Sequence, residues 1–100
     1  MAYRVEFTTE ALDQLRSLPA HDRATVLAIT REQLVHEPNR ATRNRKPMRP
    51  NPLAPWVLRI GHLRVYYEVA EPPLRVVTIR AIGVKVRERV FVAGVEIDLS

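Results

Sequence analysis

Two runs of alternating residues joined by a glycine constrain the fold of this chain more than any other feature. The runs are Trp56–Ile60 and Leu63–Val69, and large apolar side chains fall on every second position of each. A period of two predicts strands with one buried face. Gly61, the first residue of a two-residue loop, suits a type II′ turn between them. That turn fixes the register of the predicted hairpin. The facing pairs are Trp56–Tyr67, Leu58–Val65, Arg59–Arg64 and Ile60–Leu63.

The predicted register places two arginines opposite each other, on the face away from the large apolar residues. Like charges at this spacing repel by up to ~1 kcal/mol. An anion bridging Arg59 and Arg64 would remove the conflict, and guanidinium groups bind phosphate well. Tyr66 shares this face and is expected to stack on a base. The alternative is that both arginine side chains splay apart into water.

The segments before the hairpin predict a strand followed by two helices. Tyr3–Phe7 alternates like a strand, and Thr8 or Thr9 can cap a helix that Pro19 ends. A second helix is expected to run from about Asp22 to about Glu37. The expected apolar positions of the two helices are Leu12, Leu15, Leu18, Val26, Leu27, Ile29 and Leu34.

The remaining segments complete a single domain, since 100 residues leave no room for two. Residues 38–55 are rich in proline and predict an ordered but irregular basic loop, anchored by apolar residues at 48, 53 and 56. Leu74–Val84 predicts an interior strand, Val90–Val92 a last short strand, and Ala93–Ser100 a tail. The predicted class is therefore α+β in the order β-α-α-β-β-β, with a helical hairpin on one face of a small antiparallel or mixed sheet.

The positive charge of the chain is concentrated between Pro38 and Tyr67. The net charge is +5, and this segment carries no acidic residue. Its basic residues are Arg40, Arg43, Arg45, Lys46, Arg49, Arg59 and Arg64. A polyanionic partner, either nucleic acid or an acidic protein segment, is the prediction. Arg43, Arg45, Lys46 and Arg49 are the loop residues expected to contact RNA, and a basic surface that serves only solubility is the alternative.

Other classes of protein are disfavoured by residues that the chain lacks. It has no cysteine, which excludes disulfides, thiolate zinc sites and cysteine nucleophiles. The three histidines show no metal-ligand spacing, so neither metal nor cofactor is expected. No signal peptide or apolar run of about 20 residues is visible. A cytoplasmic protein without membrane contact is the expectation.

The element order and the segments TTEALDQLRSLP, WVLRIGHLRVYYEV and RVVTIRAIGVKVRERVF resemble the RelE/ParE superfamily of bacterial type II toxins, over nearly the whole chain. Members of the RelE branch cut messenger RNA without a metal, many of them in the ribosomal A site, through attack of the 2′-hydroxyl on the adjacent phosphate. The resemblance implies catalytic roles for Arg59, Arg64 and Lys85. Arg87 alternates with Lys85 and is expected on the same face. A cognate antitoxin is the implied partner, with messenger RNA or the ribosome as target.

Two positions depart from the pattern of the superfamily. Val57 stands where a lysine is frequent, and Phe91 where the best-known members have a tyrosine that handles protons. The remaining candidates for proton transfer are Tyr66, His62, Glu88 and Lys85. The departures leave three readings: a metal-independent endoribonuclease, a ParE-like inhibitor of DNA gyrase, and a catalytically weak module that binds RNA or antitoxin.

Overall fold

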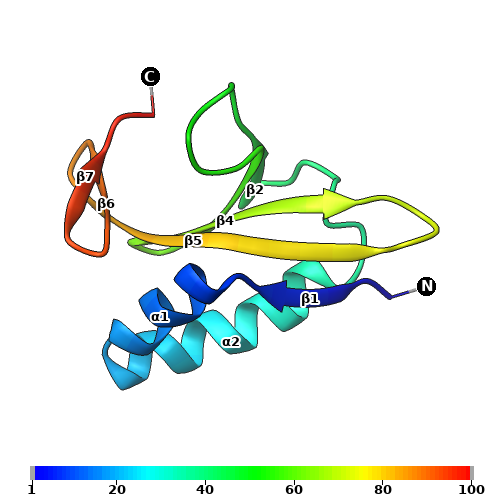
Figure 1. The fold of residues 1–100 in the computed structure, drawn as a ribbon, viewed down its shortest axis with the longest axis horizontal. Helices are drawn as coiled ribbons and strands as arrows, with labels where there is room; N and C mark the ends of the chain where they lie inside the picture. The colour runs from blue at the N-terminus through cyan, green and yellow to red at the C-terminus, as the bar shows by residue number, and fades with distance from the viewer. Residues whose placement is uncertain (1, 100) are drawn as a thin grey trace.

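A computed structural model describes residues 2–99 as two helices packed against one face of a mixed sheet (Figure 1). The helices are α1 (Thr9–Ser17) and α2 (Ala20–Leu34). The strands are β1 (Arg4–Phe7), β2 (Arg45–Pro47), β3 (Trp56–Ile60), β4 (Leu63–Ala70), β5 (Val76–Val86), β6 (Arg89–Val92) and β7 (Val95–Ile97). The sheet order is β2-β3-β4-β5-β6-β7, and β1 also pairs with β5. The predicted α+β class and RelE-like order are confirmed.

The long strand β5 organises the sheet. One of its edges pairs with β4 from Val76 to Val84. The other edge is shared, because β1 runs parallel to its first half and β6 antiparallel to its second half. Between β1 and β6, the Gln14 side chain of α1 accepts a hydrogen bond from the backbone N–H of Ile82 at 2.8 Å. The expectation of an interior strand in a mixed sheet therefore holds.

The hairpin of β3 and β4 has the register that the sequence predicts. All the predicted pairs form, including Arg59 with Arg64. Gly61 has φ of +57°, the left-handed region that favours glycine. The side chains of Leu58 and Val65 are fully buried against the helices. The turn chemistry and the alternation were sufficient to specify this element.

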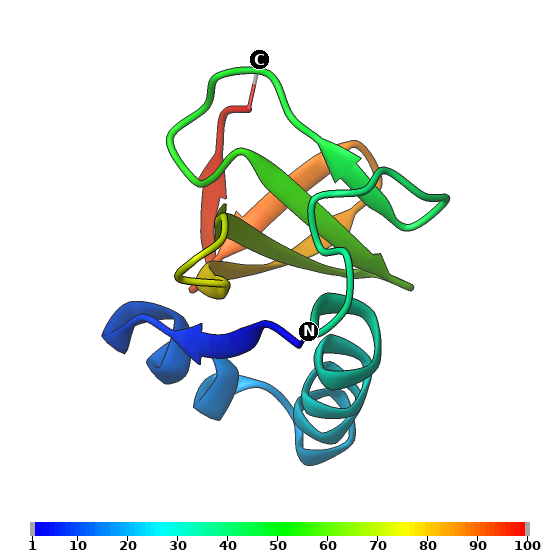
Figure 2. The same cartoon turned by 90° about the vertical axis from the view of Figure 1, so that its right-hand side faces the viewer.

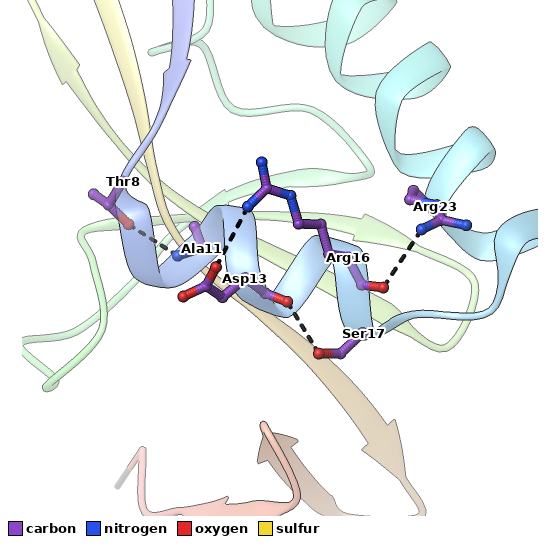
Figure 3. A network of polar contacts seen from close by, with 6 residues as sticks. All are labelled: Thr8, Ala11, Asp13, Arg16, Ser17 and Arg23. Carbon is purple, nitrogen blue, oxygen red and sulfur yellow. Dashed lines mark hydrogen bonds and ion pairs between the residues drawn. The ribbon is translucent and has the colours of Figure 1, made fainter.

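The helices begin and end close to the predicted positions. The Thr8 hydroxyl oxygen accepts a hydrogen bond from the Ala11 N–H at 3.1 Å and so caps α1 (Figure 3). At the other end of α1, Arg23 of α2 donates to the Arg16 carbonyl oxygen. One expectation for α2 was wrong, because Leu27 is 43% exposed. The buried face of α2 instead consists of Val26, Thr30 and Leu34.

The sheet carries a core on each face. The larger core lies between the helices and the sheet. The smaller core lies on the opposite face and consists of Ala54, Val57, Tyr66, Ala81 and Val92. It is covered by the 48–55 segment and by residues of the C-terminal strands, which approach that segment in Figure 2. This second core explains why Val57 and Tyr66 break the apolar pattern of the hairpin.

Two segments predicted to lack regular structure contain strands. Residues 38–55 include β2, which pairs with β3, and the predicted tail includes β7, which pairs with β6. Both strands have only three residues, too few to show a period. The anchors Met48 and Leu53 pack on the smaller core as expected, while Trp56 packs on the larger one.

Candidate nucleic-acid interface

Four cationic residues lie in a row across β2, β3, β4 and β5, on the sheet face opposite the helices. We call Lys46, Arg59, Arg64 and Lys85 the cationic stripe. Lys46 pairs with Val57, which lies two residues before Arg59 and therefore on the same face. Arg59 pairs with Arg64 directly.

The stripe continues onto β5 through a glycine. Arg64 pairs with Gly83, and Lys85 lies two residues further along the same face. A Cβ atom at Gly83 would lie 2.9 Å from Val90 Cγ1 and 3.3 Å from the Tyr66 ring. Glycine thus allows the smaller core to pack tightly beside the stripe, and no acidic residue occupies a strand position within it.

Arg59 and Lys46 are the exposed members of the stripe. The backbone N–H of Arg59 donates to the Asn44 carbonyl oxygen at 2.8 Å, which extends the contact of β3 with the segment before β2. Arg43, the residue before Asn44, is exposed. Of the predicted loop cations, Lys46 therefore lies in the stripe and Arg43 in the segment that contacts β3.

Arg64 is held in a fixed position at the centre of the stripe. It is only 9% exposed, and its Nη1 donates to the carbonyl oxygens of Gly61 at 2.7 Å and Leu63 at 2.8 Å. Burial and the nearby Arg59 charge lower the pKa of the Arg64 guanidinium. The alternative that both arginine side chains splay apart into water fails for Arg64, because the turn encloses it. A fixed, partly desolvated cation beside an exposed one is suited to hold an anion.

Lys85 closes the stripe beside the hairpin turn. Its backbone N–H donates to the His62 carbonyl oxygen at 2.8 Å, and it pairs with Val90 of β6. Its half-buried side chain comes from the same strand face as Gly83. The β3–β4 turn and the pairing of β5 with β6 therefore fix the position of Lys85.

Comparison with known proteins places this arrangement in a family. No family model and no curated protein matches the sequence. Among solved structures, a chain of the toxin–antitoxin complex RelBE2 from Mycobacterium tuberculosis matches with a TM-score of 0.72 and 28% identity, over 85% of this chain and 93% of that chain. In fold and in part of its sequence, this chain is similar to a RelE-family toxin. The resemblance seen in the sequence is thereby confirmed.

Tyr66 does not have the role expected from the sequence, which was to stack on a base. Its side chain is 1% exposed within the smaller core, so its ring offers no face to a base. Burial raises the pKa of its hydroxyl, and the Arg64 charge opposes that shift. The expectation failed because it took the whole of this sheet face to be open to solvent.

Arg45 is also removed from the expected RNA-binding set. It pairs with Leu58 and therefore faces the helices, where it is 9% exposed. Its guanidinium donates to the carbonyl oxygen of Gln33, near the end of α2. Arg45 attaches β2 to the helical layer, whereas its neighbour Lys46 faces the stripe. Strand alternation separates the two, and the sequence-based expectation of a loop could not.

The last turn separates two other residues from the stripe. Arg87 is exposed, with φ of +57°, in the turn between β5 and β6, so the alternation that would place it beside Lys85 ends before it. Phe91 pairs with Val84, which packs on the helix-side core. The Phe91 ring therefore lies on the face opposite the stripe, and a tyrosine there would not reach a phosphate on the stripe.

The other candidates for proton transfer are exposed. His62 lies at the hairpin turn, 3.5 Å from a carboxylate oxygen of Asp22 in α2. Glu88 lies in the turn after β5. Within residues 2–99, no three histidine or acidic side chains gather as a metal site would need. No helix in that range is long and apolar enough to cross a membrane.

Proposed function

We propose that this RelE/ParE-superfamily protein is the toxin of a type II toxin–antitoxin pair and acts as a metal-independent endoribonuclease. The cationic stripe is the observation that carries the proposal. Four cations in register on four strands, one of them buried and fixed, favour a phosphate backbone as ligand. The excess charge of the chain lies in and around this stripe.

The reaction that fits the stripe requires stabilisation of the negative charge that develops on the phosphorane, and cationic side chains can supply this without a metal. The 2′-oxygen of a ribose attacks the adjacent phosphorus, the bond to the 5′-oxygen breaks, and the products carry a 2′,3′-cyclic phosphate and a 5′-hydroxyl. The proton of the 2′-hydroxyl must leave, and the 5′-oxygen must gain one. Arg59 and Arg64 would stabilise the phosphorane, at ~10²–10³-fold per preorganised donor.

Lys85 is the proposed proton-transfer residue of the stripe. A guanidinium keeps its proton, with a pKa above ~12, whereas an amine releases one more readily. Lys46, the other lysine, lies at the far end of the stripe on the edge strand β2. Lys85 occupies the next position after Gly83 on the same face of β5, and Gly83 pairs with Arg64. A positioned acid or base contributes ~10²–10⁴-fold.

An antitoxin is the proposed protein partner. The solved relative was crystallised as a toxin–antitoxin complex. An acidic helix or extended segment would complement the basic surface around the stripe. Messenger RNA, on the ribosome or free, is the proposed target of the toxin.

Growth arrest on expression tests the proposal in cells. Wild type is expected to arrest growth, while Lys85→Ala and Arg59→Ala are expected to relieve the arrest. Arg31→Ala is the matched control, because Arg31 is an exposed arginine on α2, in the layer that covers the opposite face. Arrest that survives both stripe substitutions would contradict the catalytic proposal.

One observation favours a second candidate function, inhibition of DNA gyrase. A gyrase inhibitor needs no proton-transfer group, and within residues 2–99 the stripe itself offers none besides its two lysines. Supercoiling by purified gyrase in the presence of the protein distinguishes the two candidates.

A further inference from the structure

A cleft on the same sheet face as the cationic stripe combines charged groups of both signs with apolar walls. It has a volume of about 370 Å³ and lies between the 48–55 segment and the side chains of Glu68 and Arg80. Arg80 Nη1 donates to Glu68 Oε1 at 3.1 Å, and both side chains are nearly half exposed. We propose that this cleft, called the Glu68 cleft below, binds one unpaired guanine base of an RNA strand held by the stripe. The inference rests on the proposed RNA-cleaving function.

The wall of the cleft is held in a fixed shape. The Asn51 side-chain oxygen, Oδ1, accepts hydrogen bonds from the backbone N–H groups of Leu53 at 2.8 Å and Ala54 at 3.1 Å. Its amide nitrogen donates to the carbonyl oxygens of Arg49 at 2.7 Å and Ala54 at 2.9 Å. One side chain thus makes four hydrogen bonds to the backbone of its own segment. A cleft fixed in this way loses little entropy when a ligand enters.

The charged groups of the cleft favour a ligand with both donors and acceptors. Glu68 is the one carboxylate of the lining and pairs with Arg80, and Arg49 adds a second guanidinium. A guanine base matches both groups, because its N1–H and 2-amino groups donate to a carboxylate and its O6 and N7 accept from a guanidinium. Adenine has no N1–H and no 2-amino group. The prolines and apolar side chains of the 48–55 segment offer a surface for the ring.

The position of the cleft favours RNA over a protein segment. Glu68 lies four residues beyond Arg64 on β4, about 13 Å along the strand, within reach of a short single strand. The exposed Lys46 lies in the stripe, and the exposed Arg49, three residues further along the chain, lines the cleft. The volume is at the low end of the ~300–1,000 Å³ typical of ligand sites, which suits a base better than a helix.

The test measures RNA affinity by fluorescence anisotropy. The probes are two short single-stranded RNA oligonucleotides that differ only in one guanine replaced by adenine, with a 2′-O-methyl group on every ribose to prevent cleavage. Wild type is expected to bind the guanine probe about tenfold more tightly. Glu68→Gln, which keeps the shape and loses the carboxylate, is expected to reduce this ratio to about one.

Two control variants separate the cleft from the rest of the surface. Glu96→Gln removes a carboxylate that also pairs with an arginine, Arg89 at 3.9 Å, and is expected to keep the tenfold ratio. Arg59→Ala is expected to weaken both probes equally. Equal binding of the two probes by wild type would overturn the guanine cleft and leave the proposed function intact. Failure of wild type to bind either probe would overturn the proposed function itself.

Discussion

At the scale of single residues, the two facing arginines differ in what they do for the protein. Arg59 is exposed, whereas Arg64 is buried and donates to two carbonyl oxygens at the turn. Arg59→Ala is expected to lower the salt dependence of RNA binding by about one unit of slope without changing stability. Arg64→Ala is expected to lower that slope as well, and to cost ~1–3 kcal/mol of unfolding free energy because it leaves buried polar groups unpaired.

Urea unfolding and salt titration of RNA binding, measured on both variants, check this difference. Equal stability of the two variants would show that the Arg64 contacts do not matter to the fold. An unchanged salt slope in both would show that the pair does not bind phosphate.

The buried tyrosines predict a loss of stability at alkaline pH. Burial raises the pKa of Tyr66 and of Tyr67 in the folded state. In the unfolded chain both ionise near pH ~10. Below that pH the two neutral tyrosines contribute fully to the free energy of unfolding. Above it, the tyrosines of the unfolded chain lose their protons while those of the folded protein keep them, so the free energy of unfolding falls as pH rises. Urea unfolding between about pH 9 and about pH 11 should show a shallower fall for Tyr66→Phe than for wild type. Parallel curves would refute this linkage.

At the scale of elements, the parts of the fold that the sequence predicts well are those with a local signal. The hairpin register follows from Gly61 and from alternation over five or more residues, and α1 follows from Thr8 and Pro19. The short strands β2 and β7 have no such signal, since each depends on a neighbouring strand for its hydrogen bonds. Their existence is a property of the folded sheet rather than of their own residues.

The 48–55 segment provides a prediction at this scale. Asn51→Ala removes four hydrogen bonds to the segment's backbone. We expect a loss of ~1–3 kcal/mol in unfolding free energy, together with a weaker preference for guanine, because the cleft wall is no longer fixed. Asn44→Ala is the control, since Asn44 is exposed and its hydrogen bond with Arg59 uses the backbone oxygen, which alanine keeps. Equal unfolding free energies for the two variants would contradict the role given to Asn51.

At the scale of the whole molecule, the two sheet faces have different tasks. The helices cover one face, and the other is divided between the smaller core and the cationic stripe. The sequence predicts the stripe only in part: the facing of Arg59 and Arg64 follows from the hairpin register and Lys85 from the resemblance, whereas Lys46 was expected in an irregular loop. It could not show that Tyr66 and Arg45 are buried, because the segments that bury them are distant in sequence. Tyr66 is covered by residues 48–55 and the C-terminal strands, and Arg45 binds the end of α2.

The most direct test of the proposed function is RNA cleavage by the purified protein, on programmed ribosomes in the presence of Mg²⁺ and on free messenger RNA with and without EDTA. Wild type is expected to cleave equally well in EDTA and to leave 2′,3′-cyclic phosphate ends. Lys85→Ala is expected to be slower by ~10²–10⁴-fold in single turnover, and the Arg31→Ala control to match wild type. If the protein inhibits supercoiling by gyrase and cleaves neither ribosome-bound nor free messenger RNA, the proposed endoribonuclease function is contradicted.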